Sequence, residues 1–187
     1  MHRWPVFASP FRIWFFSGSL CASLFVLPWI AQFAGTMAWQ PLHNLYWWHQ
    51  HEMIYGVTLP FILGFLLTAS SNWTGESPVT PLQTVILVSL WWLARIAIAL
   101  NLPVIVVWFL ELTPILTAAA LLASLLIRHN NRRNLIIVGM VLLLAVSDAM
   151  QLLYPASVGL WSRFSILVVI LLISIFGGRV IPFFTDQ

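Results

Sequence analysis

The run Trp48-His49-Gln50-His51-Glu52-Met53 is the densest group of potential metal ligands in the sequence. Neutral imidazole binds haem iron and copper well, and a thioether favours reduced copper. Glu52 is placed to orient a ligating histidine through a hydrogen bond from outside the coordination sphere. The zinc-protease motif is excluded, because Tyr55 stands where its second histidine is required. The run therefore predicts a metal or haem site at His49 and His51.

The spacing of the two histidines restricts how they can share that site. Residues two positions apart on an α-helix point about 200° away from each other. Either His49 lies in an extended segment before the helix, or His49 and His51 have different roles. His43, on the same predicted side of the membrane, is the third candidate ligand, whereas His2 and His129 lie roughly 30 Å away across the bilayer. The alternative interpretation is that these histidines only tolerate the headgroup region.

The composition places these residues in a membrane protein. Hydrophobic residues make up 61% of the chain and charged residues only 7%, whereas soluble domains contain about 25% charged residues. A soluble fold of this length cannot cover so much apolar surface with so few charges. The net charge of +3 is too small and too scattered to indicate nucleic-acid binding. The single cysteine, Cys21, cannot form an internal disulfide and is interpreted as a small hydrophobic residue.

Apolar segments long enough to cross a bilayer, which takes about 20 helical residues, occur repeatedly along the chain. They are 12–34, 50–70, 82–101, 104–127, 134–153 and 157–177. Proline, glycine and asparagine residues mark the breaks between them. The first segment is too long for a signal-peptide core and is interpreted as a span. We therefore predict an all-α, polytopic membrane helix bundle with about six transmembrane helices, forming one membrane domain over residues 1–187.

The positions of the arginines predict the orientation in the lipid bilayer, because basic residues near span ends remain in the cytoplasm. With the N-terminus in the cytoplasm, the arginines outside the spans all fall on the cytoplasmic side: Arg3, Arg12, Arg128, Arg132, Arg133 and Arg179. The 35–48 loop is then periplasmic. Its aromatic residues are predicted to form a belt at the membrane interface: Trp39, Tyr46, Trp47 and Trp48.

Four ionisable residues fall within the predicted spans: Arg95, Glu111, Asp148 and Arg163. Each costs roughly 2.5–3.5 kcal/mol at a helix centre, so each needs a partner or a cavity. A tight turn near Leu102 would bring Arg95 level with Glu111, and a turn near Pro155 would bring Asp148 level with Arg163. We predict two ion pairs, which either link helical hairpins or line a cavity on the periplasmic side.

Several motifs resemble the NnrS family over essentially the whole chain. They are Trp48 to Gly56 (WHQHEMIYG), Gly64 to Ala69 (GFLLTA), Asn72 to Gly75 (NWTG), Arg95, Asn131 to Leu135 (NRRNL) and Gly177 to Thr185 (GGRVIPFFT). The resemblance implies a bacterial inner-membrane protein that contains haem and copper and is associated with denitrification and with tolerance of nitric oxide or nitrosative stress. His49, His51 and Glu52 are the site positions that carry over. The last motif contributes Gly177, Gly178, Arg179 and Pro182, to which we assign no role.

Members of this family are about twice as long and have twice as many spans, so the chain is expected to correspond to their N-terminal half. The leading hypothesis is a haem- and copper-binding protein for nitric-oxide stress. A second hypothesis is half of a transporter with no metal, since intramembrane ion pairs and helix-interrupting prolines fit a carrier. A third is a truncated remnant that inserts into the membrane without a function.

Overall fold

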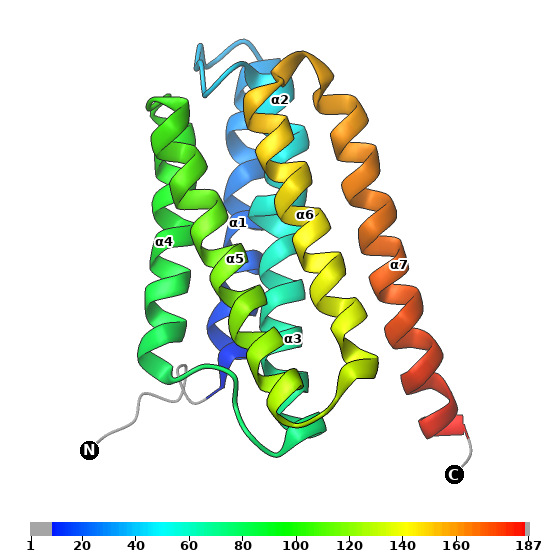
Figure 1. Ribbon diagram of the computed structural model, residues 1–187. Helices are drawn as coiled ribbons and strands as arrows, with labels where there is room; N and C mark the ends of the chain where they lie inside the picture. The colour runs from blue at the N-terminus through cyan, green and yellow to red at the C-terminus, as the bar shows by residue number, and fades with distance from the viewer. Residues whose placement is uncertain (1–8, 186–187) are drawn as a thin grey trace.

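The computed structural model describes the backbone of residues 9–185 and the side chains of residues 9–178. Within this part of the chain all regular secondary structure is helical, as Figure 1 shows. The described residues contain 6 stretches that are long and apolar enough to cross a membrane: Pro10–Phe33, Leu45–Thr74, Pro81–Ala99, Val104–Arg128, Arg132–Leu153 and Pro155–Gly178. The predicted fold class, an all-α polytopic membrane bundle, is therefore confirmed.

The helices follow one another with short connections. Their bounds are α1 (Pro10–Phe33), α2 (Leu45–His51), the π-helix η2 (Glu52–Thr58), α3 (Leu59–Thr74), α4 (Pro81–Ala99), α5 (Val104–Arg128), the 3-10 helix η3 (Arg132–Asn134), α6 (Leu135–Leu153), the 3-10 helix η4 (Pro155–Ser157) and α7 (Val158–Thr185). The predicted spans match these helices closely except at both ends of the second, predicted as 50–70 and observed as Leu45–Thr74, and at the end of the last, predicted at 177 and observed at Thr185. The second span begins at Leu45 because Asn44 caps it, with its side chain accepting a hydrogen bond from Trp47 N.

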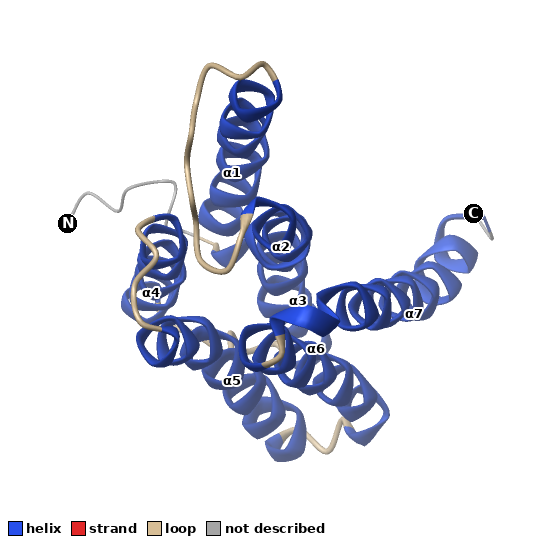
Figure 2. Ribbon diagram, turned by 90° about the horizontal axis from the view of Figure 1, so that it is seen from above, coloured by secondary structure: helices blue, strands red, loops and turns tan. Residues whose placement is uncertain are grey.

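Successive spans run in opposite directions. The α1–α2, α4–α5 and α6–α7 connections lie together at the top of Figure 1, and we call this the α2 end. The start of α1 and the α3–α4 and α5–α6 connections lie at the opposite end (Figure 1). Arg12 and the basic residues from Arg128 to Arg133 belong to this opposite end. The continuous stretch α2–η2–α3 is the most buried of the spans. In its membrane-spanning part 56% of the residues are buried, against 22% for both α1 and α7. Seen from above in Figure 2, α3 lies among the other helices.

The first and third helices approach each other closely because glycines face the contact. A Cβ added at Gly64 of α3 would lie 2.7 Å from the Cβ of Trp14 in α1. A Cβ added at Gly18 of α1 would lie 3.0 Å from the ring of Phe61 in α3. Small residues at such crossings let helix backbones pack tightly in lipid. This contact holds α1 against the central stretch.

The π-helical segment η2 interrupts the central stretch just before Pro60. Proline has no N–H to donate, and its ring clashes with the carbonyl four residues earlier in an α-helix. The wider π-turn avoids this conflict. Trp91 Nε1 of α4 donates to the Tyr55 carbonyl at 2.9 Å. In the π-helical pattern this carbonyl would accept from the residue five positions later, but that residue is Pro60, which has no N–H. The π-segment therefore sets the facing of His51, just before it, and of Glu52, its first residue.

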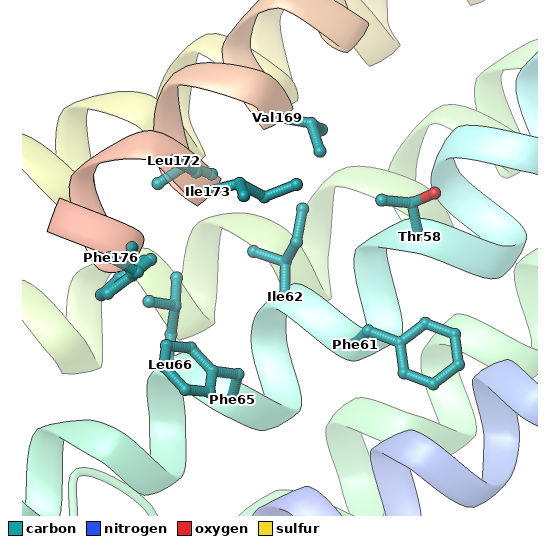
Figure 3. Close-up of a pocket in the computed structure, with 10 residues that line it drawn as sticks. Thr58, Phe61, Ile62, Phe65, Leu66, Val169, Leu172, Ile173 and Phe176 are labelled. Carbon is teal, nitrogen blue, oxygen red and sulfur yellow. The ribbon is translucent and has the colours of Figure 1, made fainter. Parts of the chain in front are cut away.

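An apolar groove lies between α3 and α7, and Figure 3 shows side chains that line it. It encloses about 450 Å³. Its lining is Thr58, Phe61, Ile62, Phe65, Leu66, Val169, Leu172, Ile173, Phe176 and Gly177. The lining carries no charged group, so the groove suits hydrocarbon and offers no site for polar chemistry.

The predicted aromatic belt is wrong for two of its members. Trp47 and Trp48 are only 1% and 2% exposed. Since the helix begins at Leu45, both residues lie on its first turns and turn into the bundle. Tyr46, between Leu45 and Trp47, is exposed.

Candidate functional site

The two histidines of α2 face different surroundings. Both are helical, so the alternative in which His49 precedes the helix in an extended segment is wrong. His51 is 0% exposed and lies inside the bundle, whereas His49 is only partly buried. Residues two apart on a helix diverge by about 200°, and the structure shows this divergence in their environments.

Carboxylates contact both ring nitrogens of His51. Nδ1 lies 3.3 Å from Glu52 Oε1, and Nε2 lies 2.8 Å from Asp148 Oδ1. The ring is stacked on Trp47 at a centroid distance of 4.6 Å. A neutral imidazole has a single N–H, so both contacts are hydrogen bonds only when His51 is an imidazolium or one carboxyl carries a proton. Both ring nitrogens of His51 are therefore engaged, and neither is free for a metal.

Arg95 of α4 extends this arrangement across the bundle. Its Nη1 donates to Glu52 Oε2 at 2.9 Å, and its Nη2 pairs with Glu111 of α5. The predicted Arg95–Glu111 pair is therefore present, and Glu52 joins it as a second carboxylate. We call the five residues Glu111, Arg95, Glu52, His51 and Asp148 the buried ion network. Their helices are α5, α4, η2, α2 and α6, so the network ties together most of the bundle.

The buried ion network has more acidic than basic side chains. It holds the three carboxyl groups of Glu52, Glu111 and Asp148 against the single guanidinium of Arg95 and the imidazole of His51. The network is neutral only if at least one carboxyl carries a proton. Uncompensated charge is expensive in a low-dielectric interior. Oδ2 of Asp148 has no hydrogen-bond partner in the described part of the chain, so the network also has an open acceptor.

The predicted pair between Asp148 and Arg163 is wrong. Asp148 contacts His51 instead, and Arg163 is exposed, with no ion pair among the described residues. The buried face of α7 passes through Ser162, Ser165 and Val168, and Arg163 lies beside this stripe. Asp148 and Arg163 lie at a similar depth in the membrane, which is the only basis for predicting their pair. Depth does not determine which way a side chain faces.

A second set of hydrogen bonds holds α6 and α7 against the central stretch. The Tyr55 hydroxyl donates to the Leu144 carbonyl at 3.1 Å and lies 2.8 Å from Ser165 Oγ. Ser165 Oγ donates to Ser147 Oγ at 2.7 Å. Ser147 is the neighbour of Asp148, so these bonds fix the backbone that presents Asp148 to His51.

His49 offers a different environment from His51. Its ring stacks on Trp29 of α1 at 3.9 Å with an interplanar angle of 16°. Its Nδ1 is buried and has no hydrogen-bond partner among the described residues. His43 lies in the loop before α2 at a positive φ of 63°, and its ring lies 3.2 Å from the Leu152 carbonyl through Nε2. Burial lowers the pKa of His43, so this loop histidine favours the neutral form.

The donor set inside the network does not suit reduced copper. Ligand atoms of His51, Glu52 and Glu111 lie within 4.8 Å of one another. This set has one imidazole and two carboxylates, whereas reduced copper favours thiolate and thioether. Arg95 already pairs with both carboxylates. The guanidinium thus fills the place of a cation, and His51 and Glu52 act as members of an ion network.

The remaining sequence-predicted positions lie at the far end of α7. Gly177 borders the apolar groove, and Gly178 is exposed. The side chains of Arg179 and Pro182 lie outside the described residues. The structure therefore brings Glu52, His51, Asp148, Arg95 and Glu111 together and leaves the Gly177–Pro182 motif far from them, at the opposite end of α7 (Figure 1).

Sequence reasoning did not place Trp47 in the site. Its ring and that of Tyr55 flank the ring of His51. Gly56 was also missed: a Cβ there would collide with the Glu52 carboxylate and lie 3.3 Å from Arg95 Nη1. The signal in the sequence was a glycine, Gly56, followed four residues later by a proline, Pro60. This spacing indicates an irregular helical turn at which another group can approach the backbone closely.

Comparison with known proteins agrees with this architecture. The model of the NnrS protein family matches residues 5–187. No curated protein and no solved structure matches the chain. Because the family model covers nearly the whole sequence, the chain belongs to the NnrS family.

Proposed function

We propose that this multi-pass NnrS-family chain binds haem in the bacterial inner membrane and contributes to tolerance of nitric oxide and to denitrification. Membership of the family supports the cofactor and the physiological role. The observation that carries the proposal in this chain is the unpartnered Nδ1 of His49. His49 is the histidine of α2 with a ring nitrogen not engaged by a carboxylate.

His49 has the properties of a haem ligand. Its side chain is only partly buried, and the stacked Trp29 ring holds the imidazole in one orientation. A haem held by His49 would supply an iron that can bind nitric oxide. His51 lacks these properties because its surroundings enclose it completely. His43 remains a second candidate, since its contact with Leu152 uses only Nε2.

We assign no copper ligands in this chain. The resemblance implies copper as well as haem, but two of the three close donors, Glu52 and Glu111, are already paired with Arg95, and the third, His51, contacts Glu52 and Asp148. Elemental analysis of the purified protein therefore tests copper independently of the haem assignment.

The test is to purify the full chain in mild detergent, supply haem, and record oxidised and reduced absorption spectra with iron and copper analysis. We expect a Soret band that His49→Ala removes. The matched control is His129→Ala at the opposite end of the bundle, which should keep the band. A His49→Ala protein with an unchanged spectrum and iron content would contradict the assignment.

One observation favours a second candidate, half of a carrier without metal. Charged residues meet inside the bundle beside the π-helical interruption of a span, and interrupted helices mark ion sites in transporters. A carrier half would be a folded, helical and colourless protein after haem addition. That outcome, with no iron or copper in the wild-type protein, would replace the haem proposal by this one.

A further inference from the structure

A second pocket ends on the buried arginine. It lies between α1, the α1–α2 loop and α4, and it encloses about 230 Å³. Exposed Met37 lies in its wall, while Trp48 and Arg95, 2% and 3% exposed, form its buried part. Arg95 lies one turn before the end of α4, so the pocket belongs to the α2 end of the bundle.

The walls of the pocket are aromatic. Trp48 meets Trp39 edge to face at 4.9 Å and Phe25 at 5.4 Å. Trp39 Nε1 donates to the Ala99 carbonyl at 3.0 Å, which fixes one wall to the end of α4. Aromatic faces and edges of this kind bind flat rings well. The pocket therefore suits a flat, apolar ligand.

Arg95 gives the pocket one polar feature. Its Nε is buried and has no hydrogen-bond partner among the described residues, while its two terminal nitrogens face Glu52 and Glu111. An unsatisfied buried donor costs about 1–3 kcal/mol. A ligand in the pocket whose acceptor reaches this donor, after a small shift of the arginine side chain that opens Nε to the pocket, would remove that cost.

The charge around Arg95 decides which acceptor fits. The guanidinium is already paired with Glu52 and Glu111, and the buried ion network holds three carboxyl groups against this one guanidinium. An anionic ligand, such as a phosphate headgroup, would add repulsion in a low-dielectric site. A neutral carbonyl oxygen accepts the hydrogen bond without adding charge.

We propose that this pocket, lined by Phe25, Trp39, Trp48, Ala99 and Arg95, binds a neutral single-ring carbonyl compound of the quinone type. The ring lies between the aromatic walls, and a carbonyl oxygen accepts a hydrogen bond from Arg95. The volume is smaller than the roughly 300–1,000 Å³ of drug-sized sites, which restricts the bound part to one ring. Binding is independent of haem at His49.

The experiment is calorimetric titration of the full-length protein in nanodiscs with duroquinone, after subtraction of the signal from empty nanodiscs. Durene is the matched probe, because it has the same methylated ring without the carbonyl oxygens. We expect durene to bind about tenfold more weakly or worse, which corresponds to the loss of one hydrogen bond to a charged group. Equal binding of the two probes would overturn the proposal and indicate an apolar cavity only.

Two variants locate the bound ring. Ala99→Phe adds bulk inside the pocket and should weaken duroquinone binding at least tenfold. Ile62→Phe adds the same kind of bulk in the α3–α7 groove and should leave the affinity unchanged. An unchanged affinity in Ala99→Phe, or a loss confined to Ile62→Phe, would contradict the assignment. Displacement of duroquinone by phosphatidylglycerol but not by phosphatidylcholine would also overturn it, because the pocket would then take an anion.

Discussion

The molecule uses the same three residue types in two places, with opposite surroundings. One set is Glu52, Arg95 and His51 inside the bundle, and the other is Glu76, Arg128 and His129 at the opposite end. The contact distances are similar, 2.9 and 3.3 Å inside against 3.2 and 3.0 Å outside. Exposure differs: the inner side chains are 0–2% exposed and the outer ones 35–58%. Distance alone therefore says little about what a charged contact contributes.

The energetic contrast follows from solvent. Water screens an exposed pair and competes for its hydrogen bonds, so such pairs contribute little. A buried pair has lost its hydration, and removal of one partner leaves an uncompensated charge. The inner set is thus essential to the folded state, whereas the outer set is dispensable.

The largest expected effect comes from Arg95→Leu. The change leaves Glu52 and Glu111 buried without their cation, which we expect to destabilise the protein by about 3–5 kcal/mol. The measurement is the yield of monodisperse protein in detergent and its thermal midpoint. Arg128→Leu is the matched control and should behave like the wild type. If the two variants had the same midpoint, the contrast between the two sets would be wrong.

Exchange of the charges of Arg95 and Glu111 sharpens the contrast. The double variant Arg95→Glu/Glu111→Arg keeps that pair but places a carboxylate against Glu52. We expect it to fold no better than Arg95→Leu. Addition of Glu52→Gln removes the repulsion and should recover part of the lost thermal stability. Full recovery in the double variant would mean that the Glu52 contact contributes nothing.

Gly56→Ala tests how closely the inner set is packed. A Cβ at this position collides with the Glu52 carboxylate and lies 2.8 Å from the Phe25 ring. Overpacking of this kind costs about 1–3 kcal/mol, so the thermal midpoint should fall. Gly139→Ala of α6 is the control, since its added Cβ meets nothing within 4 Å. That variant should be unchanged or slightly stabilised, because alanine favours helix over glycine.

The smallest effect is expected at Glu76. The neighbouring His129 and Arg128 lower the pKa of this exposed carboxyl below its ordinary value of 4.5. Because folding lowers the pKa of Glu76, its contacts with His129 and Arg128 stabilise the folded state above pH 4.5. This stabilisation is lost as the pH falls through the pKa that Glu76 has in the folded protein. Thermal midpoints of wild type and Glu76→Gln should differ slightly at neutral pH and converge in acid. A difference that grows on acidification would contradict this assignment.

The sequence alone predicted the six helices because their signals are local. Apolar length defines each span, and Thr80 with Gln83 forms a capping box at the start of α4. The Arg95–Glu111 pair was also within reach, since a three-residue turn after Leu100 makes α4 and α5 antiparallel neighbours. Depth along adjacent helices can then be counted residue by residue.

Contacts between helices distant in sequence were not predictable in this way. The His51–Asp148 contact joins residues 97 positions apart, and the rotation of both helices decides it. The π-segment adds to the difficulty, because it changes the facing of everything before Pro60 relative to what an α-helical count gives. The error at Arg163 has this origin, because the helix position was inferred correctly and its rotation was not. The errors at Trp47 and Trp48 arose because the helix begins at Leu45, inside the predicted loop.

The π-segment also makes the chain sensitive to length at one place. Deletion of one residue within Glu52–Thr58 would let the span close into continuous α-helix, as far as Pro60 allows. Every residue from Leu45 to His51 would then rotate by about 100° relative to α3. His51 would leave Asp148, and His49 would leave Trp29. Relatives with an insertion or deletion in this segment would thus present different side chains to the bundle interior, even where the letters of the histidine run are identical.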